Sequence, residues 1–215
     1  FAYLDIGDSL VQEAESLYAL CDTVQRTVVH VLEDSSATRY YAGTMKTIPF
    51  SIDSIWLSLS DVSSSFPQIR FVRDLARICR PDTVYEHCPL YVEVGVSLAQ
   101  SWFLCDVDTL RDSTNQRRMI VFHQNKDSVL NAMVREYPHG WLTVEYEEFI
   151  IEWWLSPRGK QTDLAMFAVV DPDIWIPRWL FSVVSRYVFP GMLTGYEKYL
   201  REKAQDRERS GGPGK

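Results

Sequence analysis

The last third of the chain combines two long β patterns with one long amphipathic helix, and this combination restricts the fold most. Residues 141–155 are rich in aromatic and β-branched side chains, which favour a strand. Ser156-Pro157-Arg158-Gly159 is a turn sequence, and residues 162–170 form the second strand of a predicted hairpin. Asp171-Pro172-Asp173 then ends the strand pattern, and Pro177 suits the first turn of a helix. We therefore expect an α+β fold, with a curved antiparallel sheet wrapped around a long C-terminal helix.

The predicted C-terminal helix has an apolar stripe at helical spacing, which should pack on the sheet. Proline removes one helical hydrogen bond and clashes with the preceding turn, so Pro190-Gly191 should kink this helix. If the helix covers a cavity as a lid, Pro190 and Gly191 are the predicted hinge. The residues of the stripe are Ile176, Leu180, Val184, Tyr187, Leu193, Tyr196 and Leu200.

The rest of the chain has shorter elements that complete the same α+β pattern. We expect one domain over residues 1–207 and a flexible, Gly-rich tail over residues 208–215. The chain begins at Phe1 rather than Met, which favours a domain cut from a longer protein. The predicted helices are 9–22, 51–62 and 69–78, the extended segments are 24–32, 39–48, 84–108 and 118–123, the loop is 111–117, and 127–135 fits a helix or a strand.

The composition limits the classes of partner. With 22 basic and 29 acidic residues the net charge is −7, so the surface repels phosphate backbones and a nucleic-acid-binding role is not expected. The same charge opposes electrostatic docking on anionic lipid unless a local basic patch provides it. Seven Trp residues suit a thick core or the wall of an apolar cavity. No run of 18 consecutive apolar residues occurs, so we expect no membrane-spanning helix.

Catalytic and metal-binding motifs are not found in the sequence. The four His residues have no partner at metal-ligand spacing, and neither a Gly-x-Ser-x-Gly nor a phosphate-binding loop occurs. Four glutamates crowd the strand at 141–155. Alternation places Glu145 and Glu147 on one face and Glu148 and Glu152 on the other, so one pair should face inward and need a partner. We predict no catalytic residue, no metal and no cofactor.

The four cysteines, Cys21, Cys79, Cys88 and Cys105, are scattered and contain no Cys-x-x-Cys. Such a set is too sparse for a disulfide framework, and it is typical of reduced, mostly buried thiols in an intracellular protein.

Residues 141–200 resemble the C-terminal part of the StAR-related lipid-transfer (START) domains, which have a helix-grip fold. The resemblance rests on Glu148-Phe149-Ile150-Ile151 in the penultimate strand, Val169-Val170-Asp171-Pro172 at the last strand's end and Ile176-Pro177-Arg178-Trp179-Leu180 at the helix start. Phe66-Pro67-Gln68 stands where the family has a Trp-Asp pair, and Arg111-Asp112 is what matches the family's Pro-x-Ser-x-Arg-Asp pattern. These departures leave the ligand class open.

The resemblance implies a non-catalytic module that binds, and transfers, a lipid or sterol-like ligand between the sheet and the last helix. It also implies transient membrane contact and a cytoplasmic location, with membrane association through a larger parent protein. Two alternatives stay open: a regulatory or scaffolding module whose cavity is filled by its own side chains, and a helix-grip enzyme acting on an apolar substrate. The predicted cavity residues are Phe149, Ile151, Trp153, Met166, Ala168 and Val170 on the strands and Leu180, Val184 and Tyr187 on the helix.

Overall fold

The computed structural model describes residues 28–33, 38–80, 88–96, 99–112, 116–137 and 143–210. The helix predicted at 9–22 lies outside the described residues. So does most of the predicted tail, although the last helix extends through residues 208–210.

A mixed sheet of nine strands forms one layer, in the order β1-β2-β9-β8-β6-β5-β4-β3. All neighbours along this order are antiparallel, and β7 adds a short parallel pairing to β5. The N-terminal hairpin and the long last hairpin lie side by side, because β2 pairs with β9 from Tyr40 to Ile48. The strands are β1 Val28–Glu33, β2 Thr38–Ile48, β3 Val72–Arg77, β4 Leu90–Val96, β5 Ala99–Asp112, β6 Arg117–Gln124, β7 Thr143–Val144, β8 Tyr146–Arg158 and β9 Gln161–Pro172.

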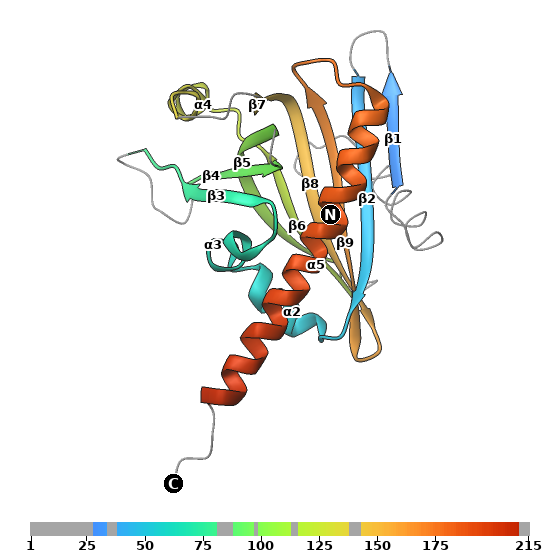
Figure 1. The fold of residues 1–215 in the computed structure, drawn as a ribbon. Helices are drawn as coiled ribbons and strands as arrows, with labels where there is room; N and C mark the ends of the chain where they lie inside the picture. Colours follow the sequence, from blue (N-terminus) through green and yellow to red (C-terminus); the bar gives the residue numbers. More distant parts are fainter. Residues whose placement is uncertain are drawn as a thin grey trace.

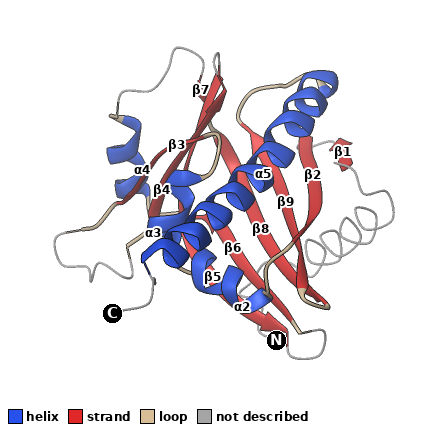
Figure 2. Ribbon diagram, turned by 60° about the horizontal axis from the view of Figure 1, so that its bottom comes forward, coloured by secondary structure: helices blue, strands red, loops and turns tan. Residues whose placement is uncertain are grey.

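The long helix α5 lies across one face of this sheet (Figures 1 and 2), as the hairpin-then-helix pattern predicts. The shorter helices α2 and α3 lie on the same side near its C-terminal half, and α4 lies at the opposite end of the sheet (Figure 1). Among the described helices, none is long and apolar enough to cross a membrane. The helices are α2 Ile52–Leu59, α3 Val62–Ser65, the 3-10 turn η1 Phe66–Gln68, α4 Ser128–Arg135 and α5 Arg178–Ser210.

Local signals explain the ends of several elements. The Ser51 side chain accepts the Ser54 N–H at the start of α2, and Asp127 accepts two N–H groups of α4, which settles 127–135 as a helix. The last hairpin turns at Gly159, which has a φ of 62° that glycine adopts without strain. Strand β8 continues to Arg158, so residues 156–158, expected in the turn, belong to the strand.

Two predicted elements differ from the structure. The helix expected at 69–78 is wrong, because the chain turns at Phe71, which has a φ of 78°, and then pairs with β4 as strand β3. The loop expected at 111–117 is shorter, since β5 continues to Asp112 and β6 begins at Arg117.

The sheet has apolar side chains on both faces. The inner face, under α5, belongs to the main core, where Trp153, Met166 and Tyr196 meet α2 and η1 residues. Trp154 and Phe167 belong to a separate outer cluster, because successive residues of a strand point to opposite faces.

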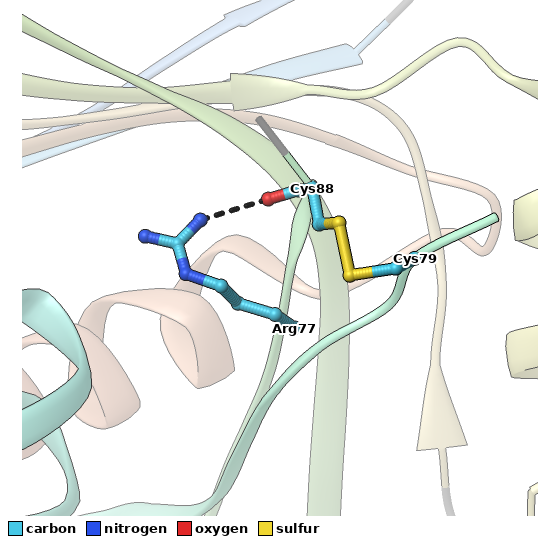
Figure 3. The surroundings of a disulfide bond; sticks show 3 residues. All are labelled: Arg77, Cys79 and Cys88. Carbon is cyan, nitrogen blue, oxygen red and sulfur yellow. Dashed lines mark hydrogen bonds between the residues drawn. A yellow bond between two sulfur atoms is a disulfide. The ribbon is translucent and has the colours of Figure 1, made fainter. Parts of the chain in front are cut away.

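Cys79 and Cys88 form a disulfide across the base of the β3–β4 connection (Figure 3). Their Cα atoms are 5.0 Å apart, and the Arg77 guanidinium donates a hydrogen bond to the Cys88 carbonyl at 2.9 Å. The expectation of reduced thiols is therefore wrong for this pair, because strand pairing brings together two residues that the sequence spaces nine apart. Cys105 is a buried free thiol, and burial raises its pKa.

Removing this disulfide should destabilise the domain. The cross-link closes a short loop, so the Cys79→Ser/Cys88→Ser variant should lose about 2–3 kcal/mol of unfolding free energy in urea denaturation. A reducing agent should lower the wild type to the level of the variant and leave the variant unchanged. Alkylation of both cysteines in the native, unreduced protein would contradict the pairing.

Candidate ligand site between the sheet and helix α5

The start of α5 is fixed to β2 by the buried Tyr40. The Tyr40 hydroxyl accepts the Ile176 N–H at 3.3 Å and donates to the Ile176 carbonyl, and its ring lies 4.7 Å from that of Phe181. Helix α5 begins at Arg178, and the carbonyl of Pro177 accepts the N–H of Phe181 at 3.1 Å. Pro177 therefore lies directly before the first turn, one residue ahead of the position predicted from the sequence.

The middle of α5 rests on the loop before β3. A Cβ added at Gly191 would lie 2.5 Å from the Phe71 ring, and one at Gly195 would lie 2.8 Å from the Arg70 backbone nitrogen. The Arg70 guanidinium also donates to the Tyr187 hydroxyl at 2.8 Å. Two glycines one helical turn apart thus let this loop sit directly against the helix backbone.

The C-terminal half of α5 closes one end of the inner face with aromatic side chains. The Tyr196 hydroxyl donates to the Ile55 carbonyl of α2 at 3.3 Å, and its ring lies 5.9 Å from that of Trp153. Phe66 of η1 packs on Trp153 and on Phe122, with ring centroids 5.4 and 5.1 Å apart. This end of the space between sheet and helix is filled by the protein's own rings.

The centre of the inner face is less completely covered. Ile151 lies on β8, which is flanked by β6 and β9. Its side chain packs against the main core and yet remains partly exposed. Because strands flank it on both sides, this exposure is on the inner face of the sheet. The cross-strand neighbours of Ile151 are Phe122 and Ala168, and Ala168 in turn pairs with Ala42. Ala168, Ala42 and Phe122 are buried, so the partly exposed side chain of this row is that of Ile151.

The predicted strand residues share one face, whereas the predicted helix residues do not meet it. Phe149, Ile151, Trp153, Met166, Ala168 and Val170 all belong to the main core. Leu180, Val184 and Tyr187 are exposed, so the prediction that they pack on the sheet is wrong, although Leu193, Tyr196 and Leu200 do pack there. The N-terminal half of α5 is apolar on both sides, and periodicity therefore could not select the inner side. The residues that face the core there are Phe181, Val188, Phe189 and Met192.

The crowded glutamates of β8 point away from this site. A register shift between Tyr146 and Glu148 breaks the alternation, so Tyr146 and Phe149 both pack on the inner core. The expectation that one glutamate pair faces inward is therefore wrong. Glu148 pairs with Arg39 at 3.2 Å, and Glu152 is buried on the outer face, where it accepts the Trp154 indole N–H at 2.6 Å.

Burial raises the pKa of Glu152 to about 7, and the hydrogen bond from Trp154 opposes this shift. Because the folded state binds this proton more tightly than the unfolded state, the wild type should lose stability as pH rises from about 4.5 to about 7. Glu152→Gln should remove this loss, which amounts to about 3 kcal/mol at most, while Glu147→Gln at an exposed neighbour should keep it. Unfolding free energies measured across this pH range test the effect, and equal slopes for wild type and Glu152→Gln would contradict it.

A small cavity lies beside the site, at the α4 end of the sheet. Its volume is about 30 Å³, enough for one or two water molecules but not for a lipid. Arg135 and Glu145 form an ion pair at 3.0 Å in its wall. Its lining is Trp102, Leu104, Gln124, Asn131, Arg135, Glu145, Tyr146 and Phe149.

Comparison of the fold with solved structures places it among helix-grip proteins, which confirms the predicted fold class and the START resemblance at the level of fold. Human STARD10 superposes with a TM-score of 0.59 at 13% sequence identity, covering 92% of this chain and 82% of that one. A STAR-related lipid transfer protein from Xanthomonas axonopodis gives 0.57 at 15% identity, covering 81% of this chain and 92% of that chain. Human StAR-related lipid transfer protein 5 gives 0.56 at 10% identity, covering 90% and 97%. No family model and no curated protein sequence matches the chain.

Proposed function

We propose that this domain binds one lipid or similarly apolar ligand between the inner face of the sheet and the N-terminal half of α5, without catalysis. The observation that carries the proposal is the partial exposure of Ile151 at the centre of the inner face, next to Ala168 and Ala42. Apolar area that the ligand removes from water there would contribute about 25 cal/mol per Å². The similarity to lipid-transfer proteins of the same fold supports the same ligand class.

The polarity of the site favours an uncharged ligand. Both buried carboxylates in the described part of the chain, Glu152 and Asp163, lie on the outer face by strand alternation. Uncharged hydroxyls are available instead: Ser185 is buried on α5, and the hydroxyls of Ser101 on β5 and Tyr146 on β8 are 3.0 Å apart. Hydroxyls orient a neutral head group without the desolvation penalty that a buried charge would incur.

The same geometry weighs against acid–base catalysis. Burial raises the pKa of Tyr146, so this phenol stays protonated at neutral pH and is not an activated base. The alternative of an enzyme acting on an apolar substrate would require an acid or base at the site, and turnover of an extracted ligand would reveal it.

A scaffolding role is the second candidate, and the aromatic packing at the C-terminal end of the site favours it. Phe66, Trp153 and Tyr196 already fill that end. If side-chain motion filled the centre as well, the domain would take up no ligand.

Transfer between membranes, an intracellular location and the absence of nucleic-acid binding remain predictions. The argument for an intracellular location rested on reduced cysteines, and the Cys79–Cys88 disulfide removes it.

Occupying the space with a larger side chain tests the ligand site directly. Ile151→Trp should lower the affinity for a fluorescent sterol or phosphatidylcholine probe by at least about tenfold, because the indole takes the ligand's volume. Leu57→Trp, on an exposed position of α2, should bind as the wild type does. Native mass spectrometry of the purified wild type should show about one lipid per chain. A wild type that neither retains nor takes up lipid would favour the scaffolding role.

The predicted hinge gives a further test of ligand entry. Pro190 cannot donate a hydrogen bond to the Arg186 carbonyl, so the segment before it should open more readily than the segment after it. On lipid vesicles, hydrogen exchange should be faster in residues 178–189 than in residues 192–207, and Pro190→Ala should reduce the difference. Uniform protection along α5 in the wild type would contradict the hinge.

A further inference from the structure

A row of basic side chains crosses the inner face of the sheet at its α2 end. The cross-strand neighbours on β2, β9, β8, β6 and β5 are, in this order, Lys46, Leu164, Leu155, Arg118 and Arg111. Three of these five side chains are cationic, in a chain whose net charge is −7. Like charges directly opposite each other on paired strands are destabilising. With Arg111 opposite Arg118, the chain keeps a charge arrangement that weakens the sheet.

The carboxylates that face this row do not neutralise all of it. Lys46 pairs with a carboxylate of α5 at 2.6 Å, and Arg118 pairs with Asp53 of α2. Among the residues that the structure describes, no carboxylate pairs with Arg111. Asp112, the next residue of β5, points to the other face by strand alternation. Because Arg111 is exposed, its charge is available to a partner.

Trp56 of α2 holds both arginines beside one ring. The guanidinium carbons of Arg111 and Arg118 lie over this ring, 5.5 and 5.7 Å from its centroid, within the range of cation–π contacts. The Trp56 side chain is only partly buried. The two guanidiniums are therefore positioned next to each other at a surface that a partner can reach. We call Trp56, Arg111 and Arg118 the arginine–tryptophan site.

The chemistry of the arginine–tryptophan site favours an acidic protein segment as the partner. Tryptophan and arginine are enriched among the side chains that dominate the binding energy of protein interfaces. A guanidinium binds a carboxylate through two parallel hydrogen bonds, so a carboxylate between Arg111 and Arg118 would also reduce their mutual repulsion. Nucleic acid or an anionic bilayer would in addition face the negative charge of the rest of the chain, whereas a short acidic segment contacts the site alone.

Asp53 acts as an internal competitor for such a segment. Its carboxylate pairs with Arg118 although the Asp53 side chain is 79% exposed. Exposed ion pairs contribute little to stability, so an incoming carboxylate can replace Asp53 with a small loss of free energy. An acidic partner therefore gains a new ion pair at Arg111 and exchanges one at Arg118.

We propose that the arginine–tryptophan site is a docking surface for an acidic segment of a partner protein. Carboxylates of the segment bind Arg111 and Arg118, and the rest of the segment packs on Trp56. This inference does not depend on the proposed ligand site, because it uses the α2 end of the sheet, where the protein's own rings fill the inner face.

Fluorescence anisotropy with synthetic peptides tests the docking surface. At low salt the whole chain should bind a fluorescein-labelled peptide Glu-Leu-Glu-Ser-Glu-Leu-Glu saturably, and it should not bind the same peptide with Gln in place of Glu. Arg111→Gln should weaken binding by at least about tenfold, because the charge-assisted hydrogen bonds of this side chain are lost. Arg209→Gln, the same change at an exposed position near the end of α5, should bind as the wild type does.

The Asp53→Asn variant distinguishes a binding role from a structural one. Removal of the competing carboxylate should raise the affinity for the acidic peptide about threefold, whereas the loss of a purely structural ion pair would not. The affinity of the wild type should fall as the salt concentration rises, because the charges involved are exposed. Circular dichroism and thermal unfolding would establish that each variant is folded.

Several results would overturn the proposal. They are a wild type that does not bind the acidic peptide, equal affinity for the two peptides, and an Arg111→Gln variant that binds as well as the wild type. Binding to vesicles of phosphatidylcholine and phosphatidylserine that Arg111→Gln abolishes, without peptide binding, would assign the surface to anionic lipid. Peptide binding that persists in Ile151→Trp, the variant with a blocked ligand site, would support a separate docking surface.

Discussion

The attachment of α5 to the sheet at separate points is the constraint on which the site depends. Tyr40 holds the first turn on β2, the glycines at 191 and 195 accept the loop before β3, and Tyr196 reaches α2. In the row of Ile151, Ala168 and Ala42 on the inner face, the two alanines are buried and Ile151 stays partly exposed. The proposed ligand site therefore depends on whether the helix, held at these points, can admit a ligand against Ile151.

The parts of the fold that depend on local patterns were predictable from the sequence. The last hairpin, its break at Asp171-Pro172-Asp173 and the long helix after Pro177 all rest on neighbouring residues. Strand β3 was not predictable in this way, because the spacing of Ile69, Val72 and Leu75 fits a helix too, and pairing with β4 decides the outcome. The Cys79–Cys88 bond has the same origin, since it requires the paired β3 and β4 to bring the two thiols together.

The candidate site was predictable on its strand side and not on its helix side. Alternation along β8 and β9 correctly groups Phe149, Ile151 and Ala168 on the inner face, because side chains of a strand leave only two choices. The irregularity between Tyr146 and Glu148 then reverses the expected direction of the glutamates. On α5 the apolar residues surround the helix before Pro190, so a stripe drawn through Leu180 and Val184 has no advantage over one through Phe181 and Val188. Only the contacts with the sheet distinguish these two stripes.

Access to the inner face would require displacement of the N-terminal half of α5. A surface that binds this segment more strongly when it is displaced would lower the free energy of opening by that difference in affinity and no more. Displacement must break the hydrogen bonds of Tyr40 to Ile176 and of Arg70 to Tyr187. Displacement would be easiest at Pro190, where the helix lacks one backbone hydrogen bond. Pro190 lies just before Gly191 and Gly195, where the loop before β3 packs against the helix. The packing of Phe181, Val188 and Phe189 on the core also holds the segment closed in water, so opening would require a surface that replaces these apolar contacts.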